Sequence, residues 1–189
     1  MTADLIDRLA GIRPGSRLDT LRGRRPDTRE HAQHAYEALF CPDVEDDVTI
    51  VERDAVAAFV TGLHGESAVA AHYAERLGEL APDLLARVRQ EIDAGRTRGP
   101  YGAYSDPELA GESTVGPSHV SKLDGRLAAA FQHAHLLVFR PREAQREDLR
   151  ALLDAGWSAT AAITLSQLVS FLSFQVRVVA GLRLLGGTA

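Results

Sequence analysis

The chain has 189 residues, of which 45% are hydrophobic and 25% are charged, and its net charge at pH 7 is -5. This is the composition of an ordinary globular protein, and the negative charge argues against nucleic acid as the main partner. The single cysteine, Cys41, excludes an internal disulfide and a C-x-x-C dithiol, and it suits a cytoplasmic protein.

Short helices are expected at the start of the chain, and we treat residues 1–48 as an N-terminal helical arm. The first runs over about residues 3–10 and stops at a glycine, and a further turn or two follows it. A longer helix spans 27–40, with Asp27 or Thr28 as its N-cap, and it ends before Cys41 and Pro42. This amino-terminal stretch has no unbroken apolar core, so we expect no signal peptide.

Residues 49–94 are predicted to form a first helical half. Thr49 and Glu52 have the spacing of a capping box, and apolar residues follow at helical spacing up to Gly65, which ends the helix. Ser67 is expected to cap the second helix. A third helix starts at Pro82 and runs to the glycine at 95.

The segment from 95 to 122 is rich in Gly, Pro and Ser, and it is too long for an idle connector. Tyr101 and Tyr104 predict that it packs on something, because disordered linkers contain few aromatic residues. We interpret it as a lid or an arm that crosses between parts of the molecule.

Residues 123–189 are predicted to form a second helical half that ends in a long apolar helix, 161–185. Gln167, Gln175, Arg177 and Arg183 interrupt the apolar run, and an arginine at a bilayer centre costs about 2.5–3.5 kcal/mol. We therefore expect a core helix, buried on most sides, and no membrane span.

Two stretches resemble one known family. "ERDAVAAFVTGLHGESAVAAHYAERL" and "EDLRALLDAGWSATAAITLSQLVSFLSFQVRVVAGL" are similar to the carboxymuconolactone decarboxylase and alkylhydroperoxidase (AhpD)-like superfamily, and most of all to its "CMD domain" proteins. The resemblance covers roughly 49–80 and 123–185. It implies a single all-α, AhpD-like domain over 1–189, built from two helical halves, and it implies a homo-oligomer.

The peroxidase members of that family carry a C-x-x-C ahead of a histidine, and this chain lacks it. If His72 is the family histidine, the cysteine positions fall on Gly65 and Ala68. In the neighbouring register they fall on Glu66 and Val69. Neither register supplies the thiols that a dithiol peroxidase needs, so we do not expect that activity.

The decarboxylase branch of the family works by acid–base chemistry without a dithiol. We therefore take His72, with Glu52 or Glu66, as the candidate acid–base pair, and His64 as a further catalytic candidate. The first hypothesis is a protein that binds a small molecule and performs decarboxylase- or isomerase-like chemistry. A non-catalytic binding or scaffold protein, and a peroxidase-related antioxidant protein that uses Cys41, are the alternatives.

Three further residues are candidates for substrate binding. Arg177 lies in an apolar run, so we expect it to be buried and to find a carboxylate, backbone carbonyls or a subunit interface. Its role would be a structural ion pair or the binding of an anion in a pocket. His133 and His135 point about 200° apart on a helix, so at most one of them faces a pocket and the two do not chelate one metal. We expect neither a metal nor a cofactor, and the small-molecule ligand stays open.

Overall fold

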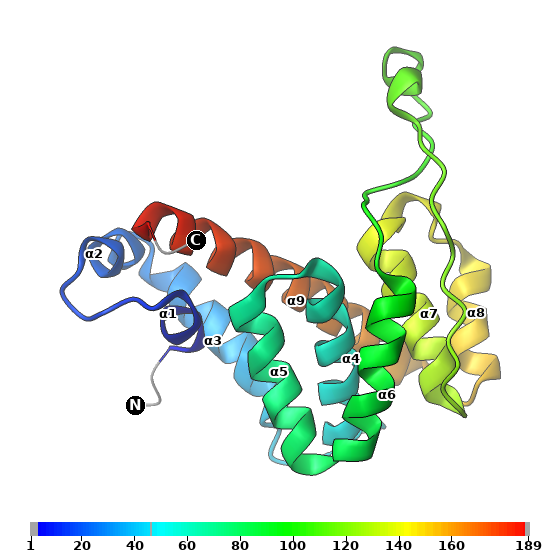
Figure 1. Ribbon diagram of the computed structural model, residues 1–189, viewed down its shortest axis with the longest axis horizontal. Helices are drawn as coiled ribbons and strands as arrows, with labels where there is room; N and C mark the ends of the chain where they lie inside the picture. The colour runs from blue at the N-terminus through cyan, green and yellow to red at the C-terminus, as the bar shows by residue number, and fades with distance from the viewer. Residues whose placement is uncertain (1–3, 46, 188–189) are drawn as a thin grey trace.

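The computed structural model describes residues 4–45 and 47–187, and this part of the chain contains helices and no β-strand, which confirms the predicted all-α class. One isolated antiparallel bridge joins Gly102 and Thr114. The helices, shown in Figure 1, are α1 Leu5–Ala10, α2 Arg17–Gly23, α3 Pro26–Phe40, α4 Ile50–His64, α5 Ser67–Leu80, α6 Pro82–Gly95, η1 Pro107–Glu112, α7 Arg126–Phe139, η2 Pro141–Glu143, α8 Arg146–Asp154 and α9 Ala159–Gly186.

Helix α4 forms the centre of the core and packs against α3, α5, α6, α7 and α9. Every residue from Arg53 to Thr61 is buried, so this helix is covered on all sides. The predicted capping box is present, because the Thr49 side chain accepts from the Glu52 backbone and the Glu52 side chain accepts from the Thr49 backbone. Gly65 ends the helix with φ of 75°, a left-handed conformation that glycine adopts without strain.

Two predicted helix starts were wrong by one or two residues. Helix α3 begins at Pro26, since proline fits the first helical position and loses no hydrogen bond there, so neither Asp27 nor Thr28 is the N-cap. Helix α5 is capped by Glu66 rather than Ser67, because the Glu66 carboxylate accepts from the Val69 amide at 2.7 Å. The longer side chain reaches the same donor that a serine would cap.

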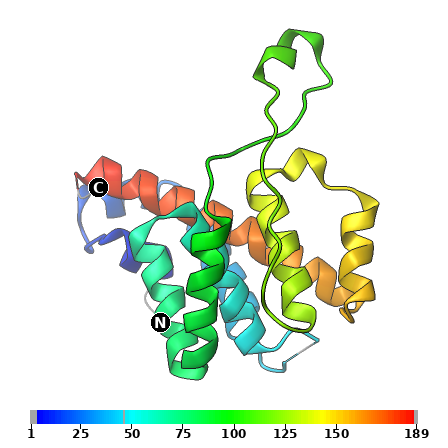
Figure 2. The same ribbon diagram turned by 45° about the vertical axis from the view of Figure 1, so that its right-hand side comes forward.

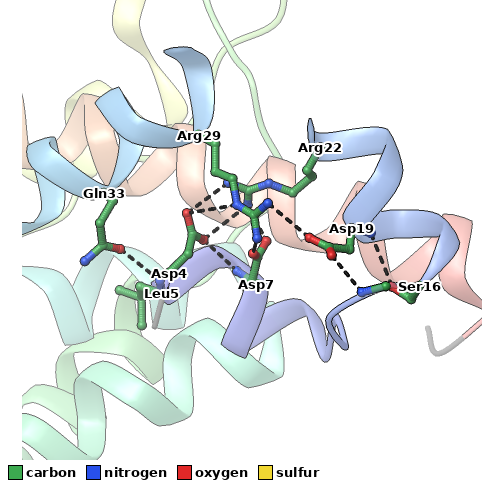
Figure 3. A network of polar contacts seen from close by, with 9 residues as sticks. Asp4, Leu5, Asp7, Ser16, Asp19, Arg22, Arg29 and Gln33 are labelled. Carbon is green, nitrogen blue, oxygen red and sulfur yellow. Dashed lines mark hydrogen bonds and ion pairs between the residues drawn. The ribbon is translucent and has the colours of Figure 1, made fainter. Parts of the chain in front are cut away.

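The three N-terminal helices are joined by a cluster of ion pairs, drawn in Figure 3. Arg22 lies 3.1 Å from both Asp4 and Asp7, and Arg29 contacts Asp7 and lies 3.0 Å from Asp19. These pairs tie α1, α2 and α3 to one another. Helices α1 and α2 also pack against α9, and Figure 1 places α2 beside the C-terminal end of α9.

The residues between α6 and α7 form an arm, 96–124, that projects beyond the helical body in both views (Figures 1 and 2). Its base is ordered as predicted: the Tyr101 amide donates to the Phe139 carbonyl at 2.6 Å, and the Tyr101 ring packs against the hydrophobic core. Tyr104 lies against the Arg142 guanidinium, whose carbon is 3.9 Å from the ring centroid. The tip of the arm, around η1, is exposed.

Helix α9 was expected to be buried on most sides, and this prediction was wrong. Only 33% of its most apolar 18-residue stretch is buried, because the body covers one side of the helix and leaves the other open. Within the described residues it is the one helix whose length and composition would allow it to cross a membrane. Buried helices of soluble proteins have the same length and composition, so this property is weak evidence for a span.

Candidate functional site

His72 lies in a polar network between α1, α3 and α5. Its Nδ1 is 3.4 Å from Arg8 Nη2, and its Nε2 is 3.5 Å from the Tyr36 hydroxyl. Because an arginine only donates, Nδ1 is the acceptor and the proton of the neutral ring lies on Nε2, facing Tyr36. Both ring nitrogens therefore have polar neighbours from the protein itself.

The network continues through Tyr36 to a buried ion pair. Arg76 Nη1 donates to the Tyr36 hydroxyl at 3.3 Å, and Arg76 binds both carboxylate oxygens of Asp54 at 2.8 and 3.1 Å. The Asp54 side chain is fully buried. Burial raises the pKa of Asp54, and the hydrogen bonds and charge of Arg76 oppose that shift. Arg76 also donates to the Phe40 carbonyl, so its role here is to join α3, α4 and α5.

The surroundings of His72 keep its ring neutral. Burial, followed by the positive charges of Arg8 and Arg76, lowers the pKa of His72 to about 4. A general base works best when its pKa is near the operating pH. His72 is thus a neutral hydrogen-bonded ring rather than a base poised at neutral pH.

The two carboxylates expected beside His72 are occupied elsewhere. Glu52 binds Arg126 on α7 through two hydrogen bonds of 2.7 Å and caps α4. Glu66 caps α5 and lies 3.6 Å from Arg183 on α9. The reason is geometric: α4 and α5 form an antiparallel pair, so the start of α4 lies away from His72, and six residues of α5 turn Glu66 about 240° away from it.

His64 lies at the contact between α4 and α9, and the charge of Arg177 acts on it. His64 Nε2 is 3.1 Å from the Ser173 hydroxyl, and burial, followed by the charge of Arg177, lowers the pKa of His64 to about 4. The prediction that Arg177 is buried was wrong. It lies on the open side of α9 and donates to the Ser173 carbonyl of its own helix at 2.8 Å, and no described carboxylate is within ion-pair distance of it.

His133 and His135 lie on α7 and face different parts of the molecule. His135 is buried, and its Nε2 is 2.9 Å from the Gly95 carbonyl. His133 is also buried, and its Nε2 is 3.0 Å from the Ser166 hydroxyl on α9. Only His133 lines one of the cavities described below.

A buried pair that sequence reasoning missed lies next to His135. His119 of the arm is 2.7 Å from Glu91 of α6, and its ring stacks on His135 with centroids 5.2 Å apart. Both partners are almost fully buried. One signal was available: Glu91 continues the buried positions Leu85 and Val88 at helical spacing, and a carboxylate on that side of a helix needs a partner.

Two cavities bear on ligand binding. The larger is an open apolar groove of about 840 Å³ between α3, α8 and α9. The smaller, of about 210 Å³, lies where the returning arm meets α7 and α8, and it is more enclosed. None of the four cavities described is lined by His72. Among residues 4–45 and 47–187, no three His, Cys, Asp or Glu side chains are grouped to hold one metal ion.

Comparisons with known proteins add nothing to the family resemblance, which depends on the sequence alone. No protein-family model matches the chain, and no curated protein matches its sequence at a significant level.

Proposed function

We propose that the protein binds a small, mainly apolar molecule in the groove between α3, α8 and α9, as a dithiol-less protein of the AhpD and CMD kind. The groove itself carries this proposal. At about 840 Å³ it has the volume of a drug-sized ligand site, and alanine, leucine, isoleucine and phenylalanine side chains supply most of its walls. The lining residues are Ala35, Ala38, Leu39, Leu149, Leu153, Ala159, Ala162, Ile163, Ser166, Gln167, Ser170 and Phe171.

One polar point in the groove would orient the ligand. The Ser166 hydroxyl donates to the Ala162 carbonyl at 2.9 Å and lies 3.0 Å from His133 Nε2, so its oxygen accepts from the histidine. Gln167 and Ser170 add exposed polar atoms at the rim. The ligand that fits has an apolar body and a single polar group.

Binding, rather than acid–base catalysis, is the function these contacts favour. His72 has a lowered pKa and no carboxylate against it, and it lines none of the described cavities. Cys41, the centre of the antioxidant alternative, is exposed at the end of α3. The proposal that His72 performs decarboxylase- or isomerase-like chemistry, with no cofactor, is thus supported by the family resemblance alone.

The groove can be tested with an apolar fluorescent probe such as N-phenyl-1-naphthylamine. Ala38 is exposed on the groove wall, so Ala38→Trp fills the groove without disturbing the core. Ala94→Trp, at an exposed position of α6 outside the groove, is the matched control. We expect Ala38→Trp to weaken the probe at least about tenfold and the control to leave it unchanged. Equal binding by both variants would contradict the proposal.

We also propose that the protein is a cytoplasmic homodimer, paired through α9. The open side of this helix carries a straight row of residues at alternating spacings of four and three, the pattern by which two helices pack along their length. Ile163, Phe174 and Leu184 are 60%, 40% and 71% exposed. The row consists of Ile163, Gln167, Ser170, Phe174, Arg177, Gly181 and Leu184.

This row matches itself when a second copy runs antiparallel about Phe174. Ile163 then meets Leu184 of the other copy, and Arg177 meets the hydroxyl of Ser170, while the two Phe174 rings meet at the two-fold axis. The partner's α9 would lie along the rim of the groove, since Ile163, Gln167 and Ser170 belong to both.

Charge at the two ends of the molecule supports the same pairing. The exposed arm tip carries Asp106, Glu108 and Glu112, and the segment around α2 exposes Arg13, Arg17, Arg24 and Arg25. The arm leaves the body beside α7, near the start of α9, whereas α2 lies at the C-terminal end of α9. An antiparallel pair of α9 helices therefore brings the acidic end of each copy toward the basic end of the other.

A short bifunctional maleimide tests the register. In a Cys41→Ser background, we expect Phe174→Cys to give a covalent dimer in high yield. Ile163→Cys alone should not, because the two Ile163 positions are about 33 Å apart in this arrangement. Mixing Ile163→Cys with Leu184→Cys restores the crosslink. A monomer by light scattering at micromolar concentration would overturn the dimer.

A further inference from the structure

The small cavity at the base of the arm is built from three elements and has a mixed lining. The returning arm contributes Ser118 and His119, and α8 contributes Asp148 and Ala151. Helix α7 forms the longest wall, with Ala129, Gln132, His133, Leu136 and Arg140. The volume of about 210 Å³ is some seven times the ~30 Å³ that a water molecule occupies in the liquid, so a molecule of a few heavy atoms fits.

His133, which lines this cavity, holds a hydrogen-bond acceptor that no described residue satisfies. His133 is 6% exposed, and its Nε2–H donates to Ser166, whose own proton is used on the Ala162 carbonyl. Burial lowers the pKa of His133, so the ring is neutral and Nδ1 carries a bare lone pair. That Nδ1 is buried and has no hydrogen-bond partner among the described residues.

Arg140 holds a hydrogen-bond donor without an acceptor. Its Nη1 donates to Glu143 at 2.9 Å, but its Nε–H is buried and has no acceptor in the described part of the chain. Buried polar atoms without partners are uncommon in folded proteins, and two at one cavity point to a missing molecule. The missing molecule must donate to His133 and accept from Arg140.

The charges around the cavity limit further which molecule can bind there. On the lining itself the charges of Arg140 and Asp148 cancel, and two carboxylates behind it, Glu143 against Arg140 and Glu91 against His119, make the surroundings negative. A simple anion would be repelled by that charge, and a simple amine would leave the Arg140 Nε–H without an acceptor. A molecule that carries both an ammonium and a carboxylate satisfies both sides.

We propose that this cavity binds a small zwitterionic amino acid of the glycine or alanine size. Its ammonium group lies toward His133 Nδ1 and Asp148, and its carboxylate lies toward Arg140 Nε. The apolar side chains of Ala129, Leu136 and Ala151 suit a short aliphatic side chain better than a charged one. This site is separate from the apolar groove, and the proposal stands whether or not the groove binds a ligand.

Nuclear magnetic resonance of the histidine rings tests this directly in the full chain. The seven histidines are labelled with ¹⁵N, and the His133 signals are assigned by their loss in His133→Gln. We expect millimolar glycine or alanine to shift the His133 Nδ1 resonance. Glycolate, which lacks the ammonium, and ethylamine, which lacks the carboxylate, should bind at least about tenfold more weakly.

Matched variants separate the site from general electrostatics. Asp148→Asn and Glu147→Gln remove the same charge one residue apart on α8, and only Asp148 lines the cavity. Arg140→Lys removes the Nε–H, and Arg142→Lys is its control outside the cavity. We expect only Asp148→Asn and Arg140→Lys to weaken glycine, at least about tenfold.

Four results would overturn the proposal. One is a His133 signal that no probe moves, which would mean an ordered water only. Another is glycolate binding as tightly as glycine, which would mean a plain anion site. The third is equal weakening by Asp148→Asn and Glu147→Gln. The fourth is glycine binding that survives Arg140→Lys. Circular dichroism of each variant confirms that it is folded before its titration is read.

Discussion

His72 and His133 are two neutral histidines on packed helices, and they differ in what their second nitrogen meets. His72 has Arg8 on one side and Tyr36 on the other, and Tyr36 leads to the buried pair of Arg76 and Asp54. His133 has Ser166 on one nitrogen and no described partner on the other, and the residue lines a cavity.

Because of this difference, the His72 ring joins helices, whereas the His133 ring has a nitrogen that could bind a ligand. A histidine whose ring nitrogens both form hydrogen bonds within the protein adds rigidity and specificity to the packing. A buried nitrogen without a partner costs free energy in the unliganded protein, and a bound molecule with the complementary donor recovers that cost. The family resemblance pointed to His72, while the hydrogen-bond inventory points to His133.

The largest effect should come from breaking the ion pair behind His72. Asp54→Ala strands the charge of Arg76 in a partly buried site, and removing one partner of a buried pair typically costs about 3–5 kcal/mol. In a chain of this size that lowers the melting temperature by roughly 6–20 °C. Asp124→Ala is the control, since Asp124 pairs with Arg87 at the surface and is 90% exposed there. Similar melting of both variants would show that the network does not hold the helices together.

A second prediction uses pH to test the neutral state of His72. Its pKa is about 4 in the folded protein and near 6.5 when unfolded, so between these values the unfolded chain binds more protons. Stability therefore falls as the pH is lowered from about 6.5 to about 4, by an amount on the order of 1–3 kcal/mol for this residue. Urea unfolding across that range should show a smaller slope for His72→Gln than for the parent. An unchanged slope would mean that His72 is solvated, and the contrast with His133 would lose its basis.

Much of the helical framework was predictable from sequence, because helix ends are written in local residue types. Thr49 with Glu52 marks a start that the structure confirms, and Gly65 marks an end. The start of α3 shifted because Pro26 takes the first helical position, and the start of α5 shifted because Glu66 caps the helix in place of Ser67.

The candidate sites depend on contacts between distant segments, and sequence alone does not contain these. Arg177 was expected inside because the apolar run around it has no visible polar side, yet which side is covered depends on where α1 to α3 and α7 dock. Nδ1 of His133 is the acceptor without a described partner because Ser166, 33 residues away, accepts the proton on Nε2. The pairing of His119 with Glu91 spans 28 residues and depends on the path of the arm.

The smallest effect is expected at Cys41, which lies beside the His72 network. It follows Phe40, whose carbonyl accepts from Arg76, so a thiol that took part in redox chemistry would have a polar neighbourhood to act through. It is nevertheless exposed and is the only cysteine, and no second thiol in the chain can resolve an oxidised intermediate. We expect Cys41→Ser to leave hydroperoxide consumption unchanged and to shift the free energy of unfolding by no more than about 0.5 kcal/mol. A clear peroxidase rate in the parent that disappears in Cys41→Ser would place chemistry back at this end of the molecule and make His72, rather than His133, the histidine to pursue.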